Sequence, residues 1–259
     1  MQETDFEDDG DFIPEREEVD WNALRSALWS LSMFDDLYMR MQATNLGIVD
    51  NFLTGLEYQV LEEQFQDRPD KSGQYFLNAQ SQMWLFSTYE LLRTWRGRVK
   101  DALKWQSNGV LQQQIEKLRE GSGFRHMGRE TRARQLQWVR DDPNSTRLLD
   151  EDLRLSHMLF AQLDYLRIAL AKHEVKGKNK SVAHAPGIGR PDPENGSLRY
   201  ELEAGRVILG TLSRRNVADG IRSWLDRSSM PSKADINAFD DYMNTDFSLL
   251  PDPFSGISN

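Results

Sequence analysis

The sequence predicts a mainly α-helical fold: a bundle of about five helices over residues 20–175, followed near the C-terminus by a small antiparallel β hairpin or meander and one more helix. Two observations lead to this prediction. Between Trp21 and His173, apolar residues recur every three or four positions, which is the spacing of amphipathic helices. After residue 180 the chain changes to short segments of strand-like composition, separated by glycine and proline, which is typical of hairpins.

The expected bundle begins with two helical runs. Asp20 is a suitable N-cap, and the apolar spacing from Trp21 to Met41 is helical. A second run continues to Phe65 after a break near residues 45–47. The two runs therefore form either a helical hairpin or one long kinked helix.

The third helical segment, from Tyr75 to about Trp105, has the strongest pattern in the chain. Its first half carries apolar residues around most of its circumference, which predicts a buried central helix. Its second half, from Arg93 to Lys100, becomes basic. We expect this half to emerge towards solvent.

The rest of the chain supplies further elements. Helices are expected over residues 112–119 and 150–173, with a basic and weakly amphipathic stretch over residues 129–139 between them. Strands are expected over residues 181–185, 198–202 and 207–212. Residues 187–196 are expected to form a long polar loop between strands. Ser213 is a good N-cap for a last helix over residues 214–224.

Charge and composition divide the chain into four segments. These are an acidic N-terminal arm (1–19), the helical bundle (20–175), an α+β extension packed on the bundle (180–228) and an acidic C-terminal tail (229–259). Residues 1–20 hold ten acidic side chains against one arginine, whereas residues 91–140 hold twelve basic side chains against four acidic ones. Such segregation indicates what kind of partner a protein binds, although not its fold.

Several classes of protein are excluded by composition. The chain has no cysteine, which excludes disulfides, thiolate metal sites and cysteine nucleophiles. The N-terminus lacks the basic and apolar regions of a secretory signal, and no run approaches the roughly 18 apolar residues of a membrane span. The four histidines lack metal-site spacing. We therefore expect a cytoplasmic protein with no membrane contact, no metal and no cofactor.

The basic stretch over residues 91–140 is the first candidate site. Its cations alternate with Trp95, Trp105, Phe124 and Trp138, a combination that contacts phosphates and stacks on unpaired bases. The expected partner-binding residues are Arg93, Arg96, Arg98, Lys100, Arg125, Arg129, Arg132 and Arg134. This interpretation makes the chain a non-enzymatic interaction or regulatory protein for nucleic acid or an acidic protein. The alternative is a solvated helix face whose arginine stems cover apolar surface, paired with the acidic arm.

The second candidate lies at the end of the last bundle helix. Arg167 and His173, with five residues between them, resemble the R-x(4 to 6)-H signature of HEPN domains. The resemblance implies a metal-independent ribonuclease that acts as a homodimer, with Arg167 as phosphate ligand and His173 as general acid or base. The simpler alternative is that Asp164 pairs with Arg167, and that Lys172 and His173 interact favourably with the helix C-terminus.

Overall fold

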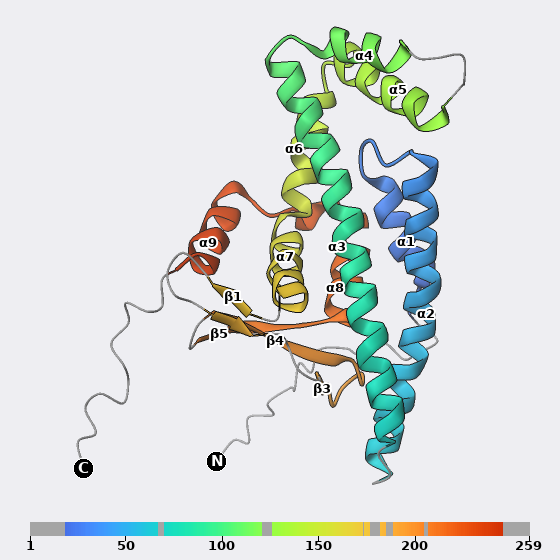
Figure 1. Ribbon diagram of the computed structural model, residues 1–259, viewed down its shortest axis with the longest axis vertical. Helices are drawn as coiled ribbons and strands as arrows, with labels where there is room; N and C mark the ends of the chain where they lie inside the picture. The colour runs from blue at the N-terminus through green and yellow to red at the C-terminus, as the bar shows by residue number, and fades with distance from the viewer. Residues whose placement is uncertain are drawn as a thin grey trace, which may run out of the picture.

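The structure is a computed structural model, which describes residues 19–66, 70–120, 126–172, 174–176, 182–184, 189–204 and 207–245. It confirms a mainly helical fold with a small antiparallel sheet near the C-terminal end. The two longest helices run side by side along the long axis of the molecule, and the sheet crosses their lower part (Figure 1). Within the described ranges, no helix combines the length and the hydropathy that a membrane span requires.

Seven α-helices, rather than about five, precede the strands in the described part of the chain. They are α1 (Trp21–Ser30), α2 (Leu37–Phe65), α3 (Lys71–Ser107), α4 (Leu111–Arg119), α5 (Met127–Asp141), α6 (Ser145–Leu155) and α7 (His157–Lys172). Two more follow the strands, α8 (Arg214–Arg222) and α9 (Lys233–Met243), joined by two short 3-10 turns over Ser223–Leu225 and Arg227–Ser229. The helix predicted over residues 112–119 is thus confirmed as α4, and the weakly amphipathic stretch over residues 129–139 lies within α5. Helix α9 was not among the predicted elements.

The two predicted N-caps are confirmed. The Asp20 carboxylate accepts a hydrogen bond of 2.8 Å from the backbone N–H of Asn22 at the start of α1. The Ser213 hydroxyl accepts one of 3.0 Å from the backbone N–H of Asn216 at the start of α8. Each side chain satisfies a backbone donor that the helix itself leaves free.

The break between the first two helices lies at residues 31–36, and the prediction of a break near residues 45–47 is wrong. Asp36 sets the true start of α2, because its carboxylate accepts hydrogen bonds of 3.0 and 3.2 Å from the backbone N–H groups of Tyr38 and Met39. Gly47 is buried in the contact between α1 and α2, where this packing keeps the helix continuous.

The predicted helix over residues 150–173 is two helices. Helix α6 already begins at Ser145, and Ser156 separates it from α7. The Ser156 hydroxyl donates a hydrogen bond of 2.9 Å to the carbonyl oxygen of Asp152 and accepts one of 2.5 Å from Nη1 of Arg96. A serine that bonds back to the preceding turn bends a helix, which explains the change of direction at this residue.

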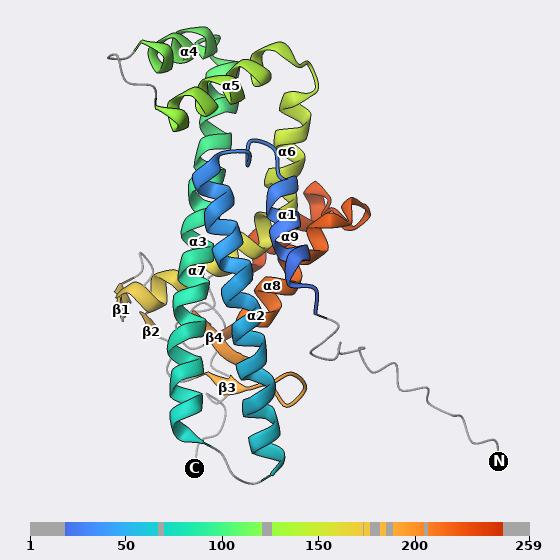
Figure 2. The ribbon, with the colours of Figure 1, turned by 90° about the vertical axis from the view of Figure 1, so that its right-hand side faces the viewer.

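The second half of α3 does not emerge towards solvent as predicted, and the first half is buried only on the side that faces the core. In its second half Trp95 and Val99 are fully buried and Arg96 is 5 % exposed. In its first half Phe76 and Met83 are 47 % and 63 % exposed. The reason is the placement of the other helices: α4, α5 and α6 cover the second half (Figure 1), whereas the outer side of the first half is open (Figure 2).

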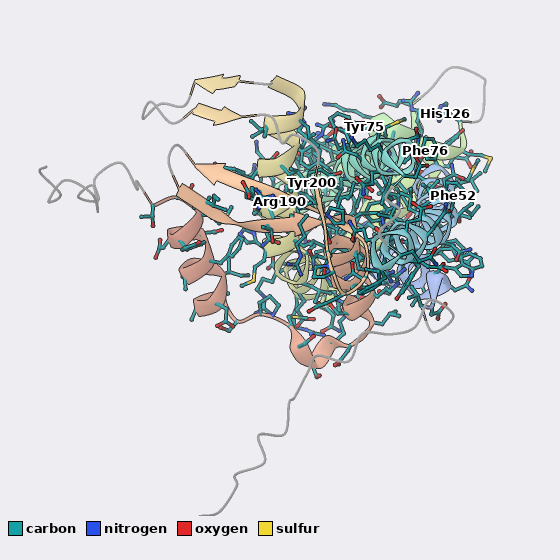
Figure 3. All side chains as sticks on the ribbon, turned by 90° about the horizontal axis from the view of Figure 1, so that it is seen from below. Phe52, Tyr75, Phe76, His126, Arg190 and Tyr200 are labelled. Carbon is teal, nitrogen blue, oxygen red and sulfur yellow. The ribbon has the colours of Figure 1, made fainter. Side chains whose placement is uncertain are left out.

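The strands form a three-stranded antiparallel sheet, in the order β3 (Arg190–Pro191), β4 (Leu198–Ala204), β5 (Val207–Ser213), and a separate pair, β1 (Glu174–Lys176) with β2 (Val182–His184). The three predicted strands are confirmed as β2, β4 and β5. Strand β3 lies in the predicted polar loop, where Arg190 pairs with Arg199. Tyr200 of β4 is buried and donates a hydrogen bond of 3.0 Å to the side-chain oxygen of Asn78, which joins the sheet to α3 (Figure 3).

A buried ionic network joins α8 to α2. Arg214 has no exposed surface, and its Nε donates a hydrogen bond of 2.7 Å to Glu57. The same guanidinium pairs with Asp50 and bonds the Thr54 hydroxyl at 3.1 Å, while Arg222 also reaches Asp50. Burial alone disfavours the charged guanidinium, but the Glu57 and Asp50 carboxylates outweigh it and raise the pKa of Arg214. The network fixes the sheet and α8 against the helical hairpin.

Candidate functional site

The eight basic residues predicted to bind a partner do not form one surface. Two of them contact carboxylates just before α2. Nη1 of Arg98 lies 3.4 Å from the Asp36 carboxylate, and Nη2 of Arg134 lies 2.9 Å from that of Asp35. The Arg134 and Gln135 side chains lower the pKa of Asp35 by bonding its carboxylate, although burial opposes this effect. These contacts attach α3 and α5 to the connection between α1 and α2.

Two more of the eight residues bond backbone carbonyl groups. Nη2 of Arg129 donates to the carbonyl oxygens of Lys117 and Glu120 at 3.0 and 3.1 Å, at the end of α4. Nη2 of Arg132 donates to the carbonyl oxygen of Arg98 at 2.7 Å. Burial, with the nearby Arg98 charge, lowers the pKa of Arg132 to about 10. Both arginines therefore hold α5 against its neighbouring helices.

Of the remaining residues, Arg93 is paired within its own helix. Arg93 forms an exposed ion pair of 2.7 Å with Glu90, three residues earlier on α3. Arg125 lies outside the described residues.

The last two predicted residues, Arg96 and Lys100, line a groove between α3, α6 and α9. The groove has a volume of about 940 Å³. Three cations from the other two helices line it as well, namely Arg147, Arg154 and Lys233. The structure thus places part of the predicted basic surface in a concave site, together with residues from elsewhere in the chain.

Arg96 is the deepest cation of this groove. Its side chain is almost fully buried, and Nη1 donates to the Leu153 carbonyl oxygen at 2.9 Å and to the Ser156 hydroxyl at 2.5 Å. The guanidinium carbon lies 4.7 Å from the ring centroid of Phe160. Nε has no hydrogen-bond partner, and none of the described carboxylates forms an ion pair with Arg96. Burial without such a partner lowers the pKa of Arg96 to about 10.

The groove carries an excess of positive charge. Arg147 is neutralised by Glu151, whose carboxylate lies 2.6 Å from Nη1. Lys100, Arg154 and Lys233 form no ion pair with any described residue; Arg154 contacts the Met230 sulfur at 3.3 Å. Four cations, with Arg96, therefore face one lining carboxylate that has no ion pair in the described chain, that of Asp150.

The start of α9 forms one wall of the groove. Ser232 caps this helix, and Lys233 and Ile236 from its first turns line the groove. The positive end of the helix dipole is therefore close to the same space. A contact of 2.7 Å between Nε2 of His157 and the Asp240 carboxylate fastens α9 to α7. The arrangement suits a bound anion, because cations and a helix N-terminus approach it from different elements.

The sequence analysis missed Arg147, Arg154 and Lys233 because they lie outside residues 91–140. The sequence does contain a pattern that places two of them, Arg147 and Arg154, on one helix face. On α6 the charged residues recur every three or four positions from Arg147 to Arg154 and continue to His157, so they share one helix face. Nothing in the local pattern shows that this face lies opposite Arg96.

The residues of the HEPN resemblance are only partly described. Arg167 lies with Nη2 3.9 Å from the Glu90 carboxylate and its guanidinium carbon 5.4 Å from the Tyr89 ring centroid. Asp164, which was expected to pair with Arg167, is hydrogen-bonded to Tyr89; burial and this bond raise the pKa of Tyr89 to about 12. His173 lies outside the described residues. The convergence of Arg167 and His173, and the ribonuclease activity, remain predictions.

Metal binding has no support within the described ranges, where no three histidine or carboxylate side chains are grouped as ligands. Comparison with known proteins adds no assignment: no family model, no curated protein and no solved structure matches this chain. The functional argument therefore depends on the geometry of the groove.

Proposed function

We propose that this chain is a non-enzymatic interaction protein that binds a phosphate-bearing partner in the groove between α3, α6 and α9. The observation that carries the proposal is the state of Arg96, a guanidinium that lines the groove, is almost fully buried and has no carboxylate partner in the described chain. A buried charge without a counter-charge is unfavourable. A phosphate bound in the groove would supply the missing counter-charge.

The flanking cations support the same proposal. Lys100, Arg154 and Lys233 come from three helices and line the space around Arg96. A single carboxylate of a partner would leave most of this charge unbalanced. A terminal phosphate carries up to two negative charges, and a nucleic-acid strand brings several phosphodiesters, each with one negative charge, close together. Phosphate therefore matches the groove better than an acidic protein side chain.

Single-stranded nucleic acid is the form of phosphate-bearing partner that we propose first. The lining of the groove includes no Phe, Tyr or Trp side chain. Contacts to the backbone phosphates would therefore provide the affinity, with little stacking on bases and little sequence preference.

Binding is tested by titrating the full chain with labelled single-stranded RNA and, separately, with pyrophosphate. Lys100→Glu should weaken binding at least about tenfold, because it puts a negative charge beside the bound phosphate. Lys104→Glu is the matched control: the same charge change, one turn further along α3, at a residue that does not line the groove. This control should bind within about twofold of the unmodified chain.

Salt provides the second readout. Affinity for RNA should fall as salt rises, with a slope near −0.7 for each phosphate contact. Binding of pyrophosphate alone would restrict the partner to small or terminal phosphate groups. Absence of binding of both ligands at low salt, or equal losses in the two variants, would refute the proposed function.

A further inference from the structure

The outer side of the α2–α3 hairpin carries several exposed apolar side chains, with uncharged polar residues between them. Met41, Ile48 and Phe52 of α2 are 53 %, 56 % and 56 % exposed, and Phe76 and Met83 of α3 are also exposed. Phe52 and Phe76 lie on the same outer side, away from the sheet (Figure 3). Single exposed apolar residues are ordinary, but a contiguous apolar surface marks a contact with another molecule.

The patterns of both helices indicate that this side is covered in the working protein. Apolar residues surround most of the first half of α3, and α2 is apolar both on the side facing the core and on the side facing solvent. A helix that is apolar all round is usually buried all round. In the structure, no described element covers the outer side (Figure 2).

The central part of this surface carries no exposed charge, although 28 % of the residues in the chain are charged, and Glu62 lies at the edge of the surface. Residues 72–89 include no charged side chain, and the only charged residues within 41–59 are Asp50 and Glu57, which are fully buried. Depletion of charge is the compositional signal of the centre of a protein interface. A neutral face also meets its own copy without bringing like charges together, whereas nucleic acid or an anionic lipid surface would need cations.

A hollow on α2 gives this face a specific shape. It centres on Gly55 and is lined by residues one and two turns away on the same helix, including Ile48, Phe52 and Gln59. Its volume is about 840 Å³. Where two helices pack, a side chain of one enters a hole formed by several residues of the other. The face thus offers both a large side chain, Phe52, and a hole next to it.

The size of the face agrees with a weak, reversible dimer contact. The part of α2 without exposed charge, residues 41–59, is ~28 Å long, and two helices side by side are ~20 Å wide. The neutral face therefore presents ~570 Å², which is below the ~800 Å² that each partner buries in interfaces of standard size and lies in the range of transient contacts.

We propose that this face is a homodimer interface. The hairpins of two copies pack face to face and antiparallel about a two-fold axis, which gives a four-helix bundle. Phe52 of each copy enters the hollow around Gly55 of the other copy. The interface is isologous, because one surface supplies both the protruding side chain and the hole. The groove between α3, α6 and α9 lies on the opposite side of α3 from α2 and stays open in the dimer (Figure 1).

Analytical ultracentrifugation of the full chain from ~1 to ~100 µM tests the dimer. The unmodified chain should sediment as a dimer at the upper end. Phe52→Glu should raise the dissociation constant of the dimer at least about tenfold, since it buries a charge at the centre of the interface. Phe65→Glu, the same substitution on the same helix but outside the neutral stretch, should leave the dimer intact.

A second variant separates an effect on the dimer from a general effect on folding. Gly55→Leu fills the hollow and also replaces glycine by a better helix former, so α2 should become more stable while the dimer weakens. A chain that stays monomeric at ~100 µM refutes the proposal and leaves the face to a different protein. A dimer that tolerates both Phe52→Glu and Gly55→Leu refutes it as well.

Cross-linking tests the register of the two copies. Because the chain has no cysteine, Phe52→Cys introduces a single thiol. A short bismaleimide should then join two copies, since residue 52 lies near the two-fold axis in the antiparallel arrangement. Phe65→Cys places the thiols at opposite ends of the paired helices and should give monomers. The reverse result would exclude the antiparallel register.

Discussion

At the scale of single residues, the buried arginines of the described chain fall into two groups. Some have carboxylates as partners, as Arg214 has with Asp50 and Glu57. Arg96 is buried with a carbonyl oxygen and a hydroxyl as partners and without a described carboxylate. Local sequence does not separate the two groups, because the partners are distant: Arg214 and Asp50 are 164 positions apart. The basic character of residues 91–140 was therefore visible in the sequence, but the roles of its individual arginines were not.

The buried network leads to a prediction about stability. Asp50→Asn should lower the free energy of unfolding by about 3 kcal/mol, because it leaves Arg214 and Arg222 with an incomplete counter-charge in a buried site. Asp219→Asn is the matched control, since Asp219 also pairs with Arg222, at 2.6 Å, but is 50 % exposed. It should cost less than about 1 kcal/mol. Denaturant unfolding monitored by circular dichroism measures both, and equal losses would contradict a dominant role for the buried pair.

At the scale of elements, the spacing of apolar residues and the capping residues predicted most of the helices. The positions of glycine and proline predicted three of the strands. The failures have tertiary causes. The hydroxyl of Ser156, which bonds back to Asp152 and bends the chain, also accepts a hydrogen bond from Arg96 of another helix. The second half of α3 is more buried than predicted and the outer side of the first half less so, because burial depends on which helices pack against each half, and a one-helix pattern does not contain this information. The apolar first half was still informative, since it indicates the surface that we assign to a second copy.

Two glycines, one inside α3 and one directly after it, should have opposite effects on stability when alanine replaces them. Gly97 lies inside the helix with open space around it, so Gly97→Ala should stabilise the chain by about 0.5–1 kcal/mol. Gly109 follows the helix with φ of +70°, and its N–H and that of Val110 bond the last turn at 3.1 and 3.0 Å. Gly109→Ala should therefore destabilise the chain by about 1 kcal/mol. Thermal unfolding of the two variants checks the signs; shifts in the same direction would show that the end of α3 is set by other contacts.

At the scale of the whole molecule, each half of α3 contributes to a different proposed surface. Its first half, with α2, is neutral and apolar and is assigned to a second copy, whereas its second half supplies Arg96 and Lys100 to the groove. A dimer built in this way presents two grooves on its outer sides. Two linked sites raise the affinity for a partner with repeated phosphates beyond that of one groove, provided that the partner spans both. The monomeric Phe52→Glu variant should then bind pyrophosphate normally.

The uneven charge of the chain gives the last prediction. Residues 1–18 contain nine acidic side chains and one arginine, so their removal changes the net charge from −9 to −1. Asp20 is retained, because it caps α1. The truncated chain should bind single-stranded RNA several-fold more tightly at low salt, since less negative charge repels the phosphates, and the gain should disappear above ~0.5 M salt as screening shortens the range of the repulsion. Fluorescence anisotropy at several salt concentrations measures this difference. A gain that persists at high salt would mean that the arm blocks the groove by direct contact, and no gain at any salt would mean that the charge of the arm does not reach the bound phosphate.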